Sequence, residues 1–435
     1  MEKSNGKKPL NVVFILTDDQ GYWSLGCYGN REVIAPNLDR LAANGCVLDN
    51  FFCASPICSP ARASIMTGLL PSQHGVVDWL AGGSINRKKF EELTVKVKKI
   101  DPAELMEPIE NIDELPDDAT IPFTETKSYQ IFKTHEDEPI EYLKDYVGYT
   151  EILAENGYVC GLSGKWHLGD SLHPQKSFSF WRTIAAGGTQ YSTPEYVRDG
   201  KIIIGDRYIT DIITDDALEF LEENAGKEAP FYLSVHYTAP HSPWHEVDQP
   251  KEIWQLYDDC PFHSTPESVE LHPDQFKGNP WPADMEQRRT MLQGYYTTIT
   301  AMDRNIGRIL DSLEEKGILD NTVVIFTADN GYNLGHHGIW GKGNGTIPYN
   351  MFDTSVKVPM IISGVPGMRP GVITELASQY DLFPTLLDLV GIKEYKANEK
   401  MPGKSFLGVL TGEQEHFRDE VVVYDEYGPV RMIRT

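Results

Sequence analysis

Cys58 is the residue whose surroundings most clearly favour chemistry, because a proline and an arginine follow it at helical spacing in SPICSPARASIMTG, residues 55–68. Pro60 suits the first turn of a helix, so we expect Cys58 at a helix N-terminus. There the helix dipole and the free backbone N–H groups favour a thiolate or a bound oxyanion, which Arg62 could also reach. The alternative is a buried, inert cysteine beside an ordinary helix start, and this spacing alone does not decide between them.

Two acidic pairs each come directly after an apolar run. Asp18 and Asp19 follow the run 11–16, and Asp329 and Asn330 follow the run 322–326. Ligands that are all oxygen indicate a hard divalent cation, Ca²⁺ or Mg²⁺, rather than zinc. Taken singly, each pair could equally be a turn or a capped loop. Two such pairs in a chain that also carries the segment around Cys58 favour a metal site.

Basic and imidazole side chains follow two further apolar runs. Lys165 and His167 come after the run 158–162, and the run 231–235 is followed by His236 and His241. A lysine supplies positive charge where a transition state develops negative charge, and a histidine can accept a proton near neutral pH. The structural alternative is a surface lysine with core histidines that are already hydrogen-bonded.

These side chains are far apart in the sequence, so strands and helices must bring them together. The four apolar runs 11–16, 158–162, 231–235 and 322–326 are continuous enough to be strands buried on both faces, and they alternate with helical patterns. This alternation predicts an α/β fold with a mainly parallel sheet, whose ligands bind beyond the carboxyl ends of the strands. We also expect a helix over residues 35–43 and a long amphipathic helix over residues 287–316.

The chain divides into a large domain, residues 1–370, and a smaller C-terminal α+β part, residues 371–435. Residues 82–138 differ in character, with charged patches, proline and little periodicity. They are interpreted as an insertion, either a solvated excursion or a lid that shapes access to a substrate. Together with this insertion, three loops that each carry a tryptophan could offer a surface that stacks on sugar rings, although each tryptophan could instead serve packing: Trp79, Trp244 and Trp281.

The composition limits the kinds of molecule that the protein could bind. A formal net charge of -25 argues against a nucleic-acid partner and disfavours long polyanions, whereas a small anionic group could bind at a local basic cluster. The six cysteines, which lack paired spacing, indicate neither a disulfide framework nor a zinc site. No run approaches the length of a membrane span, and no signal-peptide core is evident. The expected location is therefore cytoplasmic, unless a leader was removed.

The segment CSPAR, residues 58–62, with TGLLPSQHG at 67–75, resembles the signature of the Cys-type sulfatases of the alkaline phosphatase superfamily. The resemblance extends from residue 11 to about 381 and is interrupted mainly by 82–138. It implies an arylsulfatase-like sulfuric ester hydrolase with a large, mainly parallel sheet sandwiched by helices. It also implies that a formylglycine-generating maturation enzyme converts Cys58 to 3-oxoalanine (Cα-formylglycine).

Further segments match the family pattern: GKWHLG at 164–169, PHSP at 240–243 and DNGYNLGHHGIWGK at 329–342. The resemblance implies that Lys165 and Lys342 contact the sulfate and that His167 is hydrogen-bonded to a formylglycine hydroxyl. It favours His241 over His236 as the group that faces the leaving-group oxygen. The acidic pairs then correspond to the calcium site of the family, with these ligands: Asp18, Asp19, Asp329 and Asn330.

The implied mechanism begins with attack on sulfur by the hydrated aldehyde at position 58, while the cation, Arg62 and the two lysines neutralise the sulfuryl oxygens. His241 protonates the departing alcohol, and the second hydroxyl of the gem-diol then expels sulfate with assistance from His167. The expected substrate is a small organosulfate, most simply a sulfated carbohydrate, with ester versus sulfamate left open. Two alternatives remain: a phosphate or phosphonate ester hydrolase of the same superfamily, and a non-catalytic protein that binds sulfated sugars.

One departure concerns the C-terminus. The family usually closes with a small subdomain, a short antiparallel sheet with a helix, that extends well past the RMIRT element, whereas this sequence stops at Thr435. The C-terminal part is therefore expected to be incomplete. The oligomeric state is left open by the sequence.

Overall fold

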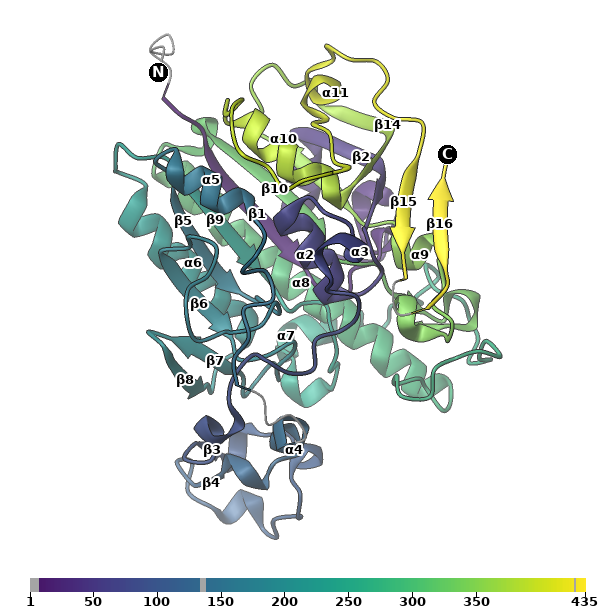
Figure 1. The fold of residues 1–435 in the computed structure, drawn as a ribbon. Coiled ribbons are helices and arrows are strands. Elements are labelled where there is room, and N and C mark those ends of the chain that lie inside the picture. The colour runs from purple at the N-terminus through teal and green to yellow at the C-terminus, as the bar shows by residue number, and fades with distance from the viewer. Residues whose placement is uncertain (1–7, 134–137, 426–427) are drawn as a thin grey trace.

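A single large sheet organises the fold, as the computed structural model shows for residues 8–133, 138–425 and 428–435. Helices cover both faces of this sheet (Figure 1). Among the described strands, β13 and β7 run antiparallel to both of their neighbours, and the other pairings are parallel. The predicted α/β fold with a mainly parallel sheet is confirmed. From one edge to the other the strands are β14 (Gly371–Ser378), β2 (Gly45–Phe52), β13 (Met360–Ser363), β10 (Thr322–Ala328), β1 (Asn11–Thr17), β9 (Phe231–His236), β5 (Val159–Gly164), β6 (Phe180–Ile184), β7 (Glu195–Arg198) and β8 (Lys201–Ile204).

The four predicted strands are neighbours at the centre of the sheet, in the order β10, β1, β9, β5, and they are parallel throughout. Their ends are in register: Thr17 lies opposite Ala328, and His236 lies opposite both Leu16 and Gly164. The chemically capable residues that follow each strand therefore leave the sheet at one edge, as the sequence predicts.

Two hydrophobic cores form because successive side chains of a strand point to opposite faces. In β1, Val12, Phe14 and Leu16 pack into one core, whereas Val13 and Ile15 pack into the other. The first core includes residues of α2, α5 and α10, and the second includes residues of α1, α6 and α8. The helices are α1 (Pro36–Ala43), α2 (Cys58–Thr67), α3 (Pro71–His74), α4 (Lys127–Lys133), α5 (Tyr149–Glu155), α6 (Ile209–Asn224), α7 (Lys251–Trp254), α8 (Met285–Glu315), α9 (Asp353–Val356), α10 (Leu382–Leu389) and α11 (Leu407–Thr411).

The two predicted helices are present as α1 and α8. The Asp284 side chain accepts a hydrogen bond from the backbone N–H of Gln287 and so caps the N-terminus of α8. The helix ends just before Gly317, which adopts a positive φ of 66°. No helix among the described residues combines the length and apolar character needed to cross a membrane.

The described part of the segment 82–138 forms a small body at one end of the molecule, seen at the bottom of Figure 1. It contains the two-stranded sheet of β3 (Thr94–Lys96) and β4 (Thr120–Pro122), together with α4. Phe90 and Phe123 from this segment share a small core with Val197 of β7, so the segment is packed against the main sheet through apolar contacts.

The C-terminal part begins within the main sheet, since β14 pairs in parallel with β2 as the edge strand. After α10 and α11 the chain forms a separate antiparallel pair, β15 (Val421–Tyr424) and β16 (Arg431–Arg434). The division into domains at residue 370 stays a prediction, and β14, which follows it, belongs to the same sheet as the four central strands.

Candidate active site

Cys58 is the first residue of α2, where Pro60 was expected to place it. Its side chain is 0% exposed and lies in an apolar cluster with Ile57 and Tyr349. Burial raises the pKa of the Cys58 thiol above its ordinary value, even though the charges of Lys165 and Lys342 act in the opposite direction. Burial therefore disfavours the thiolate that a helix N-terminus alone would favour, because desolvation outweighs the helix dipole and the nearby cations. An unmodified Cys58 is a neutral thiol here.

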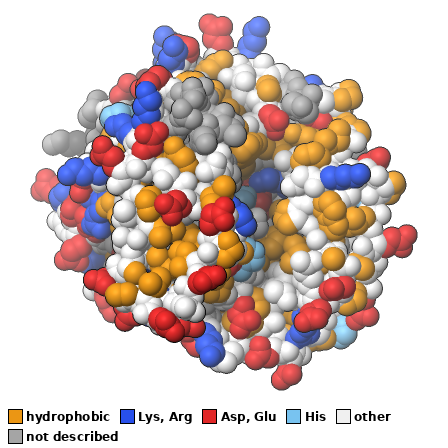
Figure 2. Space-filling model, turned by 90° about the horizontal axis from the view of Figure 1, so that it is seen from below, with side chains coloured by type: hydrophobic (Ala, Val, Ile, Leu, Met, Phe, Trp, Pro, Cys, Tyr) orange, Lys and Arg blue, Asp and Glu red, His pale blue; other side chains and the backbone are white. Residues whose placement is uncertain are grey.

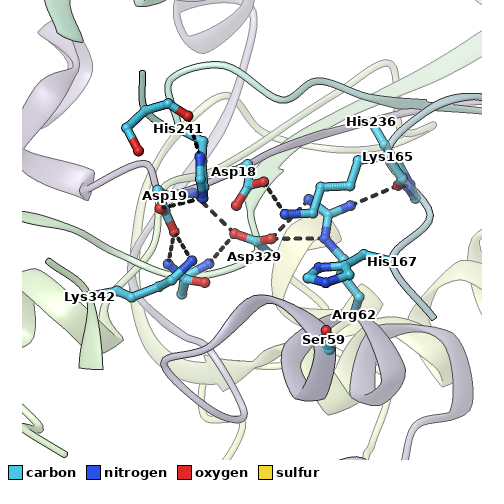
Figure 3. Close-up of polar contacts among 12 residues, drawn as sticks. Asp18, Asp19, Ser59, Arg62, Lys165, His167, His236, His241, Asp329 and Lys342 are labelled. Carbon is cyan, nitrogen blue, oxygen red and sulfur yellow. Dashed lines mark hydrogen bonds and ion pairs between the residues drawn. The ribbon is translucent and has the colours of Figure 1, made fainter. Parts of the chain in front are cut away.

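Two buried ion pairs, drawn in Figure 3, lie close enough to Cys58 for their charges to act on its thiol. Arg62 donates from Nε to Asp329 Oδ2 at 2.9 Å, and its Nη1 donates to the backbone carbonyl of Lys165 at 3.0 Å. The Lys165 ammonium forms a hydrogen bond with Asp18 Oδ2. Burial alone would raise the pKa of Asp18, but the surrounding positive charges, that of Lys165 first, hold it well below its usual range. Asp18 is therefore ionised.

Asp19 connects three of the predicted site residues. Its Oδ1 accepts hydrogen bonds from Lys342 Nζ at 2.6 Å and from Asn330 Nδ2 at 2.7 Å. Its Oδ2 lies 3.5 Å from His241 Nε2. Asp19 also has a positive φ of 60°, which costs a non-glycine residue energy and is typical of functional sites. The strand ends thus deliver the acidic pairs, a lysine and His241 to one place.

The oxygens of the acidic pairs fit a hard divalent cation. Asp18 Oδ1 and Asn330 Oδ1 are buried and have no hydrogen-bond partner among the described residues. A buried acceptor without a partner is costly, so two such oxygens in one site indicate a missing ligand. Ligand atoms of Asp18, Asp19 and His241 also lie within 4.8 Å of one another. Of the four predicted ligands, Asp329 has the oxygens most engaged in hydrogen bonds within the protein. It accepts hydrogen bonds from Arg62 and from the backbone N–H of Asn330.

His167 is a neutral imidazole with one free nitrogen. Burial first, and then the charges of Lys165 and Arg62, lower its pKa well below the ordinary value. Its Nε2 lies 3.1 Å from the carbonyl oxygen of Leu80, which can only accept, so Nε2 carries the proton. Nδ1 is then an unprotonated acceptor, and it is buried without a partner among the described residues. His167 can therefore accept a proton inside the site.

The two histidines after β9 have different environments. His236 is buried, its Nδ1 lies 3.0 Å from the Lys165 carbonyl, and burial lowers its pKa to about 3. His241 is partly exposed, and its Nδ1 lies 2.6 Å from the carbonyl oxygen of Ser242, which leaves Nε2 toward Asp19. His241 can reach a bound substrate from this position, whereas His236 supports the backbone of Lys165.

Two positioning residues were missed by sequence reasoning. Gln379 accepts from the backbone N–H of Ala54 at 3.0 Å and donates to the carbonyl oxygens of Ala328 and Asp329, so it ties the loop before Cys58 to the end of β10. The hydroxyl of Tyr295, on α8, donates to the Asp19 carbonyl at 3.0 Å and accepts from the N–H of Gly21. Neither residue follows one of the four strands or lies in one of the motifs from which the candidates were chosen.

A cavity of about 490 Å³ reaches one side of the site. Asp19, His241 and Lys342 form part of its lining, together with Trp79 from the loop after α3 and Ser128 from the segment 82–138. Figure 2 shows a hollow near the middle of this face with basic and histidine side chains inside it.

Of the tryptophans considered for sugar stacking, Trp79 is 45% exposed and lines the cavity. Trp244 is buried and donates its Nε1 proton to the carbonyl of Pro240, so of the two roles considered for it the structure supports packing. Trp281 is only partly buried but packs against the second core.

We predict that Gly187→Ala lowers kcat/KM about 100-fold, because a displacement of a catalytic group by about 1 Å can cost that much. A β-carbon at residue 187 would lie 2.2 Å from His167 Nε2 and would force the ring away from the Leu80 carbonyl. Gly188→Ala is the matched control, since its β-carbon meets nothing closer than His241 Cε1 at 3.9 Å. Steady-state kinetics on both variants, with their unfolding midpoints, would test this, and equal losses would contradict it.

Comparison with known proteins is consistent with this geometry. The profile of the family described as "Sulfatase" matches residues 10–92 and 133–392. An N-acetylglucosamine-6-O-sulfatase of Bacteroides thetaiotaomicron is 25% identical, over 90% of this chain and 69% of that protein. A choline-sulfatase of Rhizobium meliloti is 27% identical, over 92% of this chain and 72% of that protein. A solved structure in complex with its substrate, D-glucosamine-2-N,6-O-disulfate, superposes with a TM-score of 0.70 at 22% identity, over 98% of this chain and 87% of that one.

Proposed function

The chain belongs to the sulfatase family and is a sulfuric ester hydrolase, and from this premise we propose that it releases sulfate from a small sulfated carbohydrate. Members of this family generally use a formylglycine and a divalent cation. We propose that Cys58 is the residue converted to formylglycine, by a separate maturation enzyme. The neutral, desolvated thiol of Cys58 supports this, because an unmodified cysteine would be a poor nucleophile in this position.

The observation that carries the proposal is the charge balance around Cys58. Three buried carboxylates face three buried cations, in these pairs: Asp18 with Lys165, Asp19 with Lys342 and Asp329 with Arg62. Without an ion these six charges cancel. A divalent cation on the free oxygens of Asp18 and Asn330 leaves two excess positive charges, one of which an anionic sulfate ester would offset.

The cation, held by Asp18, Asp19, Asp329 and Asn330, would polarise a sulfuryl oxygen as a Lewis acid. Hydrated formylglycine at position 58 would supply both the attacking oxygen and the second hydroxyl that allows sulfate to leave. Ca²⁺ is the first choice for an all-oxygen site, with Mg²⁺ as the alternative.

The chain's own side chains perform the remaining steps. Arg62, Lys165 and Lys342 hold the sulfuryl oxygens and stabilise the charge that develops on them. When its ring carries both protons, His241 donates the Nε2 proton to the leaving oxygen, while the Nδ1 proton stays hydrogen-bonded to the Ser242 carbonyl and Asp19 Oδ2 lies 3.5 Å from Nε2. His167 accepts a proton at Nδ1, the nitrogen that lacks a partner.

The substrate is proposed from the cavity and from the relatives. A volume of about 490 Å³ lies within the range of roughly 300–1,000 Å³ for pockets that enclose small ligands. Polar side chains such as Gln190 and Asn279 line it beside Trp79, a combination that suits a sugar ring with hydroxyl groups. Two relatives act, by name, on N-acetylglucosamine 6-sulfate and on choline sulfate, so both compounds belong in a test panel.

We expect the purified protein to release free sulfate faster from 6-O-sulfated N-acetylglucosamine than from choline sulfate, and not to prefer a phosphodiester over either. Sulfate would be measured directly, and a phosphodiester and a phosphonate monoester would be assayed in parallel. Faster hydrolysis of the phosphodiester would favour the alternative of a phosphate or phosphonate ester hydrolase. No turnover by protein shown to carry formylglycine would favour a binding protein without catalytic activity.

The size of the substrate needs a separate comparison. At a net charge of -25 the protein repels an extended polyanion over a screening length of about 8 Å, whereas the buried cations act on a single sulfate at short range. Sulfated mono- and disaccharides should therefore react faster than an intact sulfated polymer, measured per sulfate group. Faster release from the interior of the polymer would contradict this.

A further inference from the structure

A second cluster of metal-ligating side chains lies where the segment 82–138 meets the main body. Asp101 comes from that segment, in a part that the family profile does not match. His245 and Asp248 come from the loop after β9. Their ligand atoms lie within 4.8 Å of one another, which among the described residues is true of only one other group, the one in the active site. Three residues from two separate parts of the chain therefore converge on one point.

The distances suit a small ion. His245 Nδ1 lies 2.9 Å from Asp101 Oδ2 and 3.7 Å from Asp248 Oδ2. In a tetrahedral site with metal–ligand bonds of about 2.0–2.2 Å, ligand atoms are about 3.4 Å apart, between these two values. Only small adjustments of the side chains would be needed to bind an ion.

Each carboxylate is held by a contact that leaves one oxygen for the ion. Asp101 Oδ1 accepts a hydrogen bond from the N–H of Ala103 at 2.8 Å, and Asp248 Oδ1 accepts one from the Ser192 hydroxyl. The remaining oxygens are the two Oδ2 atoms near His245. Outer contacts that orient the ligands in this way are typical of metal sites.

Asp248 supplies the observation that points to a missing ligand. Its side chain is 1% exposed, yet its Oδ2 has no hydrogen-bond partner among the described residues. Glu104, which is half-buried, adds a third carboxyl group close enough to interact with Asp101 and His245. His245 is the one basic side chain among these four. The cluster therefore carries excess negative charge, which a cation would offset.

We propose that Asp101, His245 and Asp248 bind one divalent transition-metal ion, of which Zn²⁺ is the first candidate, and that this ion fastens the segment 82–138 to the main body. An imidazole with carboxylates suits zinc better than calcium, and the half-exposed position of His245 leaves room for water as the fourth ligand. The site is separate from the catalytic cation, and the inference does not depend on the reaction proposed above.

The ion would also steady one wall of the substrate cavity. Ser128, which lines the cavity, donates a hydrogen bond to Glu104 at 3.3 Å, and Glu104 lies three residues after Asp101 in the same segment. Fixing Asp101 to the main body would therefore restrain the part of the segment that lines the cavity. Loss of the ion should raise KM more than it lowers kcat.

The test uses the full chain with saturating Ca²⁺ and measures bound zinc by equilibrium dialysis and elemental analysis. To exclude zinc at the active site, all variants carry Asp19→Asn. This protein should bind one Zn²⁺ per chain. Asp248→Asn and His245→Gln should each weaken binding at least about 100-fold, and Ser192→Ala, which removes an outer contact, about tenfold.

His416→Gln is the matched control. His416 also lies between two carboxylates, Glu375 Oε2 at 3.0 Å and Asp419 Oδ1 at 3.1 Å, but they contact opposite ring nitrogens and cannot share one ion. This variant should keep its zinc. His245→Gln guards against misfolding, because this side chain is 49% exposed. The proposal is overturned if the Asp19→Asn protein binds no zinc, or binds it equally after Asp248→Asn. The proposal would also be overturned if zinc left the unfolding midpoint unchanged while pH shifted it in a way that His245→Gln removes. The cluster would then bind a proton rather than a metal ion.

Discussion

Cys58→Ala is expected to lower kcat for sulfate release by on the order of 10⁶-fold, which is the scale of loss when a covalent nucleophile is removed. The fold should remain, because the site is held by strands and by ion pairs such as that of Arg62 with Asp329. Removing one buried sulfur leaves only a small cavity, with a cost of about 1–2 kcal/mol. Steady-state kinetics and circular dichroism on the same preparations would measure both effects.

Cys53→Ala is the control for this variant. Cys53 is equally buried, five residues earlier in the chain, and packs into the first core. It should lose similar stability and keep its activity. Cys58→Ser should be inactive unless the host's maturation enzyme accepts serine. Mass spectrometry of the peptide that contains residue 58, taken from active protein, should show an aldehyde in place of the thiol. Full activity with wholly unmodified Cys58 would refute the proposed nucleophile.

Asp18→Asn is expected to abolish sulfate release, and added metal should not restore it. Dialysis of the wild type against a chelator should remove activity, and Ca²⁺, or failing that Mg²⁺, should restore it. The variant loses a carboxylate whose Oδ1 has no partner among the described residues, and it leaves the Lys165 ammonium buried without its counter-charge. The second effect should also destabilise the fold by about 3–5 kcal/mol. Activity titrated against Ca²⁺, with unfolding midpoints, separates the two effects.

Asp303→Asn provides the comparison for that variant. Asp303 is another fully buried carboxylate, but it accepts hydrogen bonds from the backbone N–H groups of Asn37 and Leu38 at the start of α1. Its loss should lower stability and leave the response to Ca²⁺ unchanged. Recovery of full activity by Asp18→Asn at the Ca²⁺ concentration that serves the wild type would contradict the proposed ligand.

The convergence of the site was predictable because its parts obey local rules. Strands such as β1 and β10 are continuous apolar runs, and parallel strands present their carboxyl ends at one edge. Pro60 likewise marked the first turn of α2. These signals are short in sequence, and each can be recognised without knowing what packs against it.

The remaining features depend on contacts between distant parts of the chain. Gln379 reaches Ala54 across 325 residues, and Tyr295 reaches Asp19 across 276, so no local pattern reveals either contact. The positive φ of His167, 56°, follows from its surroundings rather than from its residue type. The protonated state of the Cys58 thiol arises in the same way, since burial is a property of the finished fold.

The complete burial of Cys58 has a consequence for the order of events during synthesis. An enzyme that modifies this side chain needs access to it, and the folded protein gives none. The ion pair of Arg62 with Asp329 joins residues 267 positions apart, so the pocket cannot close before Asp329 has been made. At synthesis rates of about 5–20 residues per second, residue 58 remains accessible for roughly 15–50 s before its partners exist. The fraction of active molecules would then depend on the relative rates of modification and folding. Slower translation of the second half of the chain would favour the modified form.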